Sequence, residues 1–181
     1  MISIKSTLLI SLIFLSSSVV AQQRYFAEKA AISFFSDGVV EDITAKNEKV
    51  TSIFDVVNGD VAYLLSIKDF QFPNKLMQVH FNEKYLESEK FPKSSFQGKI
   101  VGLNVAAGGK QNVKAVGKLT IHGVVKNIDV PGTIEVNGTR LLLSSKFMVK
   151  LLDYNIKVPQ IVYQNIAQEI EVSVEFTYRP L

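Results

Sequence analysis

Alternation of apolar and polar residues runs through most of this chain and restricts the folds open to it. The segment QEIEVSVEFTY, residues 168–178, shows it best, because every second residue from Ile170 to Tyr178 is apolar. A period of two places successive side chains on opposite faces of a β-strand, whereas an amphipathic helix needs a period of about 3.6. The segment therefore predicts a strand with one buried face, and similar runs elsewhere predict an all-β protein.

Two Asn-Gly dipeptides divide the alternating runs into hairpins. Asn58-Gly59 separates KVTSIFDVV from DVAYLLSI, and Asn137-Gly138 separates VPGTIEV from TRLLLSSKF. Asn-Gly between such runs predicts a type I′ turn, in which both central residues have positive φ. AAGGK at 106–110 makes another connection, and the count reaches about eight antiparallel strands. Further strands are expected at residues 25–35, 94–105, 110–121 and 126–136.

One segment departs from the period of two. PNKLMQVHFNEKYLES, residues 73–88, carries apolar residues at helical spacing, and Asn74 is a suitable N-cap for a helix over about 74–87. A single helix inserted into an antiparallel meander predicts a lid or a plug.

A meander of eight strands closes most readily into an up-and-down barrel, because closure removes the exposed sheet edges. An eight-stranded barrel is either filled by its own side chains or holds one small ligand. Gly98, Gly117, Ser52 and Ser145 fall among bulky residues on the predicted inner faces, which favours open space inside. A glycine within a strand marks a bulge or a bend equally well.

Composition excludes several classes of function. The chain has 181 residues, 20 Lys and Arg, 17 Asp and Glu, and no Cys. The formal net charge of +3 comes from scattered basic residues, so no nucleic-acid partner is expected. The lack of Cys excludes disulfides, a thiolate nucleophile and a Cys-based zinc site. The length suits one domain.

The first 21 residues have the pattern of a secretory signal peptide. Lys5 is followed by the apolar run LLISLIFL, and small residues precede a cleavage site expected after Ala21. The apolar run is too short to span a bilayer, which needs about 20 residues. We therefore expect a signal peptide at 1–21, one domain at 22–181, no membrane span after cleavage, and a periplasmic or secreted product.

His122 is one of two histidines and the first candidate for chemistry. A catalytic histidine needs a nucleophile to activate or a carboxylate to orient it. The nearest acid in sequence is Asp129, and no serine lies in a Gly-x-Ser-x-Gly elbow. The residues after Ile121 form a predicted loop, so a role in a turn is favoured over catalysis, and no catalytic residue is assigned.

His80 and Glu83, one turn apart on the predicted helix, are a weak metal-site signal. A site shared with His122 would require the helix to dock beside the loop that follows Ile121. The favoured interpretation is a partly buried histidine, with no metal and no cofactor. Glu87 and Glu89, weighed as paired carboxylates, are expected in a solvated turn.

GKLTIHGVVKNIDVP, residues 117–131, resembles the signature of the YceI-like family of secreted lipid-binding barrels. NEKYLESEKFPKSSFQGKI, residues 82–100, is similar to the helix and strand entry of that family. The signature positions are Thr120, His122, Gly123 and Lys126, whereas Val125 and Asn127 depart from the usual Thr and Pro. The resemblance, over about residues 30–178, implies a lipocalin-like, eight-stranded antiparallel barrel that binds a polyisoprenoid chain, and it implies no catalytic residues.

We therefore expect a barrel that holds a long apolar chain of the polyisoprenoid, quinone or polyprenyl phosphate type. Two alternatives stay open, an envelope structural or stress-response barrel without a ligand and, less favoured, a periplasmic enzyme; a homodimer also stays open. Strand parity and the helix select the candidate lining residues Tyr63, Leu65, Phe81, Tyr85, Phe96, Leu119, Leu141, Leu143, Phe147 and Val172.

Overall fold

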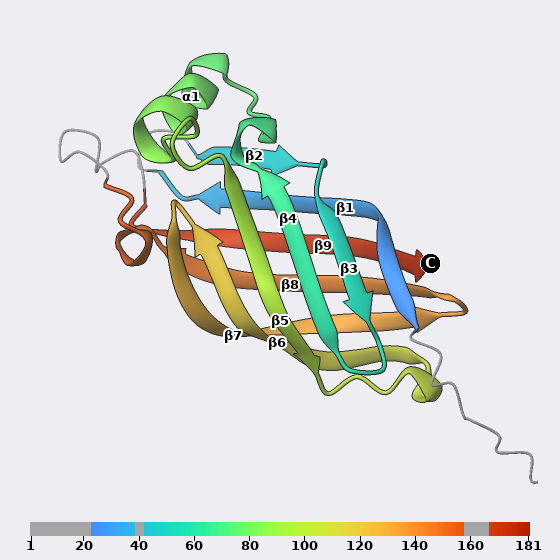
Figure 1. Ribbon diagram of the computed structural model, residues 1–181. Coiled ribbons are helices and arrows are strands. Elements are labelled where there is room, and N and C mark those ends of the chain that lie inside the picture. Colours follow the sequence, from blue (N-terminus) through green and yellow to red (C-terminus); the bar gives the residue numbers. More distant parts are fainter. Residues whose placement is uncertain (1–22, 39–41, 158–166) are drawn as a thin grey trace, which may run out of the picture.

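The computed structural model describes residues 23–38, 42–157 and 167–181, and in them a barrel of long antiparallel strands (Figure 1). The predicted signal peptide lies outside the described residues. The strands are β1 (Arg24–Ser36), β2 (Ile43–Asn47), β3 (Thr51–Asp55), β4 (Asp60–Ser66), β5 (Lys93–Val101), β6 (Gly109–Ile121), β7 (Val124–Asn137), β8 (Arg140–Lys150) and β9 (Glu169–Pro180).

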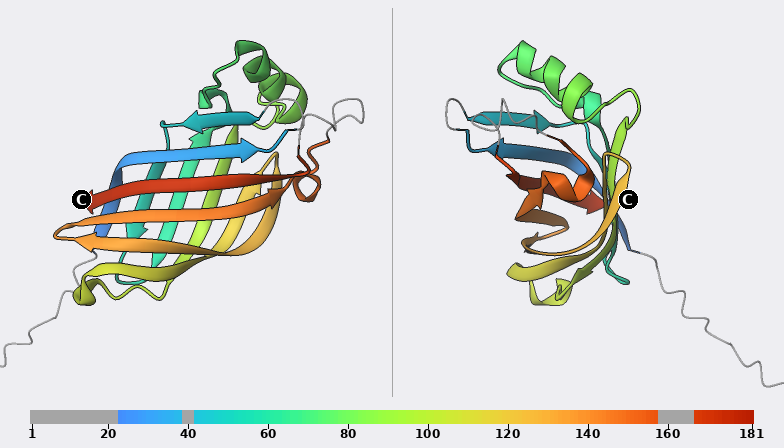
Figure 2. Two further views of the ribbon diagram at one scale, coloured as in Figure 1. Left: turned by 180° about the vertical axis from the view of Figure 1, so that it is seen from behind. Right: turned by 90° about the vertical axis from the view of Figure 1, so that its left-hand side faces the viewer.

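Each strand from β3 to β9 pairs antiparallel with the next, and β1 closes the sheet. The closing β1–β9 ladder runs from the Tyr25 and Pro180 pair to the Phe35 and Glu171 pair. Figure 2 shows the strands wrapped around a common interior. The predicted eight-stranded antiparallel barrel is therefore confirmed.

The strands β2 and β3 together occupy one position in the barrel wall. β2 pairs with the second half of β1 at Ile32–Ser36, and β3 pairs with its start at Arg24–Phe26. The buried side chain of Asn47 lies at the break, where Nδ2 donates to the carbonyl of Ser66 at 2.9 Å. β2 was not predicted as a separate strand, because ITAKN is too short to show a clear period.

The two Asn-Gly hairpins form, but neither has the predicted type I′ turn. In each, only the glycine has positive φ, 76° at Gly59 and 59° at Gly138. The β3–β4 connection spans residues 56–59, because the Asp55 carboxylate accepts hydrogen bonds from the backbone of Val57 and Asn58. In the second hairpin the two residues between the strands are Gly138 and Thr139.

The connection between β4 and β5, residues 67–92, forms a lid at one end of the barrel, visible above β2 in Figure 1. It contains the 3₁₀-helix η1 (Ile67–Asp69), the helix α1 (Lys75–His80) and the π-helical turn η2 (Phe81–Tyr85). Asn74 caps α1 as predicted, since its Oδ1 accepts from the amides of Leu76 at 2.9 Å and Met77 at 3.3 Å. The α-helix is shorter than predicted because it continues as the wider π-helical turn η2. There the Leu86 amide donates to the carbonyl of Phe81, five residues earlier.

Two further short segments complete the fold, η3 (Val105–Ala107) before β6 and η4 (Leu151–Tyr154) after β8. β5 ends at Val101, so the strand expected at 94–105 is shorter than predicted.

The inner faces follow the predicted parity. Val61, Leu65 and Ile67 on β4 and just after it are buried, as are Val174, Phe176 and Tyr178 on β9. The residues between them on β9 carry charged or hydroxyl side chains. One apolar interior therefore runs the length of the barrel.

Gly98 and Gly117 face each other on β5 and β6 and do not leave empty space. A Cβ atom on Gly117 would lie 2.5 Å from the Gly98 Cα and 2.9 Å from Cζ of Phe96. The Phe96 ring occupies the room that the two glycines provide. The glycines therefore allow an aromatic ring to lie against the wall, contrary to the expectation that they widen the interior.

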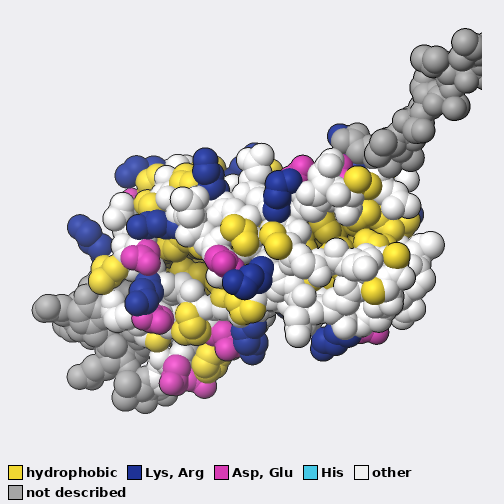
Figure 3. Space-filling view, turned by 90° about the horizontal axis from the view of Figure 1, so that it is seen from below, with side chains coloured by type: hydrophobic (Ala, Val, Ile, Leu, Met, Phe, Trp, Pro, Cys, Tyr) yellow, Lys and Arg dark blue, Asp and Glu magenta, His cyan; other side chains and the backbone are white. Residues whose placement is uncertain are grey.

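Charges of opposite sign alternate on the outer face. Ion pairs join adjacent strands, such as Lys114–Asp129 at 3.1 Å and Lys146–Glu171 at 2.8 Å. The face in Figure 3 shows basic and acidic side chains interspersed with apolar ones. That face carries no single-sign patch of the kind that binds nucleic acid.

Candidate functional site

Three apolar cavities lie in the barrel interior, one after another from the lid inward. The lid cavity, of about 70 Å³, lies between α1, η2 and the ends of β1 and β9. The central cavity, of about 80 Å³, lies between the lid and the middle of the barrel. The deep cavity, of about 40 Å³, continues toward the end that carries the C-terminus. A single water needs about 10–15 Å³, so each cavity exceeds a water-sized void.

Aromatic side chains lie where the cavities meet. Phe34 and Phe81 line both the lid and the central cavity, and their rings stack with centroids 5.6 Å apart. Tyr63 and Phe147 line both the central and the deep cavity. Movement of these side chains would join the three cavities into one channel.

The predicted lining residues divide among the cavities. Tyr63, Leu65, Phe81, Leu119, Phe147 and Val172 line the central cavity. Phe96 and Leu143 join Tyr63 and Phe147 around the deep cavity, and Tyr85 joins Phe81 around the lid cavity. Leu141 is fully buried but lines none of the three cavities.

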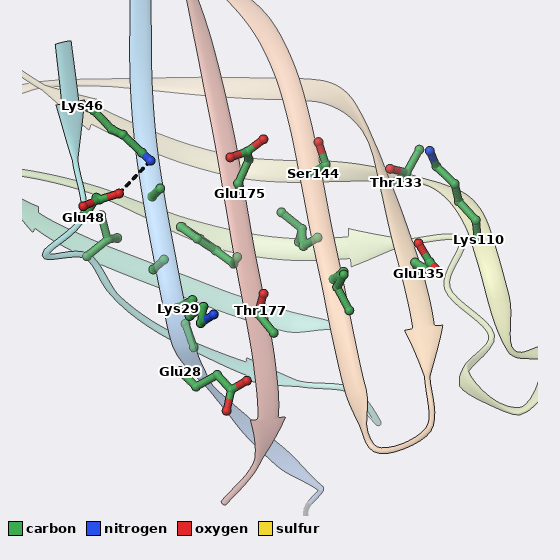
Figure 4. A pocket seen from close by; sticks show the side chains of 17 residues that line it. Glu28, Lys29, Lys46, Glu48, Lys110, Thr133, Glu135, Ser144, Glu175 and Thr177 are labelled. Atoms are coloured by element: carbon green, nitrogen blue, oxygen red, sulfur yellow. Dashed lines mark ion pairs between the residues drawn. The ribbon is translucent and has the colours of Figure 1, made fainter.

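A larger hollow lies outside the barrel, across the outer faces of β1, β9, β8 and β7. It measures about 660 Å³ and is rimmed by side chains of both charges, as Figure 4 shows for Lys46, Glu48, Lys110, Glu135 and Glu175. Lys46 and Glu48 form an ion pair with each other at one edge of it, at 2.7 Å. A wide, charged surface does not suit a long apolar chain, so the interior cavities are the candidate site.

His122 lies at the turn between β6 and β7, as predicted, and fastens the lid to it. Its Nε2 lies 2.8 Å from Oε2 of Glu87 in the lid, and its Nδ1 lies 3.1 Å from the carbonyl oxygen of Tyr154 in η4. The Phe91 ring packs edge-on against the imidazole, with centroids 4.3 Å apart. His122 is 8% exposed. The acid beside it is therefore Glu87, not Asp129, which pairs with Lys114.

The backbone at His122 explains part of the signature. His122 and Gly123 have φ values of 50° and 72°, so they form the two-residue turn itself. A Cβ atom on Gly123 would lie 2.6 Å from the Phe91 ring, so glycine is needed there for the ring to pack. β7 begins at Val124, so the expected loop is only two residues long, and Val125 and Asn127 lie in the strand.

The other two signature residues, Thr120 and Lys126, form no side-chain hydrogen bond or ion pair with the lid among the described residues. The carbonyl of Thr120 accepts a hydrogen bond from the Ser94 hydroxyl at 2.8 Å, and the Lys126 side chain is exposed.

Several hydroxyl groups inside the barrel are held by backbone or by each other. Ser52 donates to the carbonyl of Ala62 at 2.8 Å, so it accepts from the Tyr178 hydroxyl at 2.6 Å. Burial raises the pKa of Tyr178, and the hydrogen bond with Ser52 opposes that rise. Burial also raises the pKa of Tyr63. Both phenols are therefore neutral in an apolar interior.

Within the described ranges, no group of three or more His, Asp or Glu side chains is placed to hold a metal ion. His80 and His122 do not form a joint site there. In the same part of the chain, no helix has the length and hydropathy needed to cross a bilayer.

Several residues of this region were not predicted from the sequence. A cluster of aromatic rings packs below the lid, with ring centroids 5.0–5.8 Å apart. It joins Phe34 on β1 to Phe70 and Phe72 in the lid segment, and both of these to Phe81. The alternation of β1 gives a signal for Phe34, since it shares the parity of the buried Ile32. Phe70 and Phe72 lie outside any periodic run and gave no such signal.

Several solved structures have the same fold as this chain. A polyisoprenoid binding domain from Saccharophagus degradans, implicated in plant cell wall breakdown, is 14% identical, with a TM-score of 0.74 over 87% of this chain and 98% of that chain. BcnA from Burkholderia cenocepacia is 20% identical, with a TM-score of 0.69 over 82% and 95%. The YceI protein of Campylobacter jejuni is 17% identical, with a TM-score of 0.61 over 74% and 82%.

No curated protein matches the chain. The sequence does match the YceI-like domain over residues 24–178, which covers every described strand almost completely. The chain belongs to the YceI-like family.

Proposed function

We propose that this protein is exported and holds a long apolar chain, of the polyisoprenoid, quinone or polyprenyl phosphate type, in its barrel interior. The observation that carries the proposal is the run of three apolar cavities from the lid to the deep end. The polyisoprenoid binding domain of Saccharophagus degradans, which has the same fold, supports it. Export rests on the signal-peptide pattern of residues 1–21. The role is binding, not catalysis.

Burial of the chain would supply the affinity. Each CH₂ group moved from water into an apolar interior contributes about 0.8 kcal/mol. An engineered apolar cavity of about 150 Å³ holds one benzene, and each cavity here is smaller. Loading a long chain therefore requires the aromatic side chains between the cavities to move, starting with Phe34 and Phe81 below the lid.

The small volumes favour a second candidate, an envelope structural barrel filled by its own side chains. That candidate predicts only water-sized voids, whereas the central cavity measures about 80 Å³. The binding function therefore accounts better for the interior.

A variant that fills the central cavity tests the proposal. Val172→Phe places a ring where about two methylene groups of a ligand would lie, so affinity for a long polyprenol or a menaquinone should fall about tenfold. The matched control is Met148→Phe on the neighbouring strand, where the side chain is 55% exposed, and it should bind as the wild type does. If a folded Val172→Phe variant binds as the wild type does, the ligand does not occupy the central cavity. If the wild type binds neither probe, the proposed function is wrong.

A further inference from the structure

Four side-chain hydroxyls line the central and deep cavities, and three of them have partners. Ser94 donates to the carbonyl of Thr120 and Ser145 to that of Pro131, while Tyr178 donates to Ser52. The fourth, on Tyr63, has no hydrogen-bond partner among the described residues. Buried polar groups in proteins are nearly always paired, so an unpaired hydroxyl facing a cavity marks a place for a ligand atom.

The Tyr63 ring is held in place by its neighbours on the barrel wall. It stacks on Phe96 with centroids 5.8 Å apart and meets the edge of Phe176 at 5.9 Å. It lines the two cavities where they meet, in the middle of the barrel. Its hydroxyl is therefore a fixed polar point surrounded by apolar side chains, and burial, which raises its pKa, keeps it a neutral donor.

The interior offers nothing to balance a charge beside this hydroxyl. The buried polar and charged residues in the described part of the chain are serines, Asn47, Asp55 and His122, and none is Lys or Arg. His122 is already occupied by Glu87 and Tyr154. An ionised phosphate or carboxylate at mid-barrel would be buried without a counter-ion, which is strongly unfavourable.

We propose that the Tyr63 hydroxyl donates a hydrogen bond to an uncharged oxygen on the ligand, and so selects an apolar chain with a neutral carbonyl or hydroxyl group over a bare hydrocarbon or an anion. The inference rests on the proposed function and narrows its ligand class. It places the polar group of the ligand in the middle of the barrel, whereas the apolar part extends toward the lid.

Three probes with one carbon skeleton test the inference: phytane, the hydrocarbon; phytanol, its alcohol; and phytanic acid, its carboxylate at neutral pH. Displacement of an apolar fluorescent dye gives the affinity of each for the wild type and for Tyr63→Phe. The wild type should bind phytanol about fivefold more tightly than phytane, since one net hydrogen bond is worth about that factor. Tyr63→Phe should lose the fivefold preference and keep its affinity for phytane, and phytanic acid should bind more weakly than phytanol.

The matched control is Tyr25→Phe, which removes a hydroxyl from a buried tyrosine that lines none of the three cavities. It should keep the preference for phytanol. Equal effects of Tyr63→Phe on phytanol and phytane, or no effect on either, would overturn the inference while leaving the carrier function intact. A wild type that binds none of the three probes would overturn the carrier function itself.

Discussion

The imidazole of His122 joins the lid to the barrel, with Nε2 lying 2.8 Å from Oε2 of Glu87 and Nδ1 3.1 Å from the Tyr154 carbonyl oxygen. Both nitrogens face oxygen acceptors. A carbonyl oxygen and a carboxylate accept hydrogen bonds from ring nitrogens. The imidazole therefore fastens the lid to η4 and to the turn between β6 and β7.

Hydrogen exchange of the lid amides should show this contact. Protection of residues 75–86 should be lower in Glu87→Gln than in the wild type, because a hydrogen bond to a neutral amide is weaker than one to a carboxylate.

The control for this comparison is Glu89→Gln, which removes the charge from an exposed partner of Lys68. Its lid should behave as in the wild type. Equal protection of the lid in all three proteins would show that the His122–Glu87 contact does not hold the lid.

Gly117→Ala should destabilise the barrel by about 1–3 kcal/mol, the usual range for overpacking a core. The new methyl group would lie 2.4 Å from the Gln97 carbonyl oxygen and 2.5 Å from the Gly98 Cα, and neither backbone atom can move without bending a strand. Urea unfolding followed by circular dichroism measures the change.

Val116→Ala serves as the control, because Val116 is the preceding residue and its side chain is 40% exposed. This substitution should lower the free energy of unfolding by less than about 1 kcal/mol. A Gly117→Ala variant no less stable than this control would mean that β5 and β6 are not packed as closely as described.

The stability of the barrel should fall at alkaline pH. Burial raises the pKa of Tyr63, Tyr85, Tyr154 and Tyr178, whereas an unfolded tyrosine has a pKa of about 10. With the folded pKa above the unfolded one, the stabilisation is complete below about pH 10. It is lost as pH rises from there through the folded values, because the unfolded chain releases its protons first.

Urea midpoints at about pH 9, 10 and 11 measure this loss, and Tyr63→Phe isolates one contribution. The variant should lose up to about 1.4 kcal/mol less stability per pH unit above pH 10 than the wild type. Lysine titration affects both proteins alike. Identical slopes in the two proteins would show that the Tyr63 hydroxyl is not buried.

Strand alternation was sufficient to predict most of the barrel. Leu65 and Phe176 face inward because β4 and β9 keep their parity from end to end, and the strand order follows because each strand from β3 to β9 pairs with the next. β2 was missed because five residues beside a break carry little periodicity. The predicted type I′ turn at Asn58-Gly59 was wrong because the Asp55 carboxylate accepts hydrogen bonds from the loop amides. The turn preference of an Asn-Gly pair does not include this effect.

The candidate site was predictable only in part. Parity placed Tyr63, Phe147 and Val172 on the inner wall, where they line the central cavity. The partner of His122 lies 35 residues away in an irregular segment, and no local pattern connects His122 with Glu87. The expectation of open space beside Gly98 was wrong, because the sequence does not show that the Phe96 ring fills it.

Native mass spectrometry of the protein purified gently from a bacterial envelope, followed by denaturing spectrometry and extraction of any released compound, shows whether the barrel holds a ligand. We expect one apolar chain per protein, lost on denaturation, carrying an uncharged oxygen. A protein mass without adduct, unchanged after incubation with quinones and polyprenyl phosphates, would contradict it and identify the barrel as one filled by its own side chains.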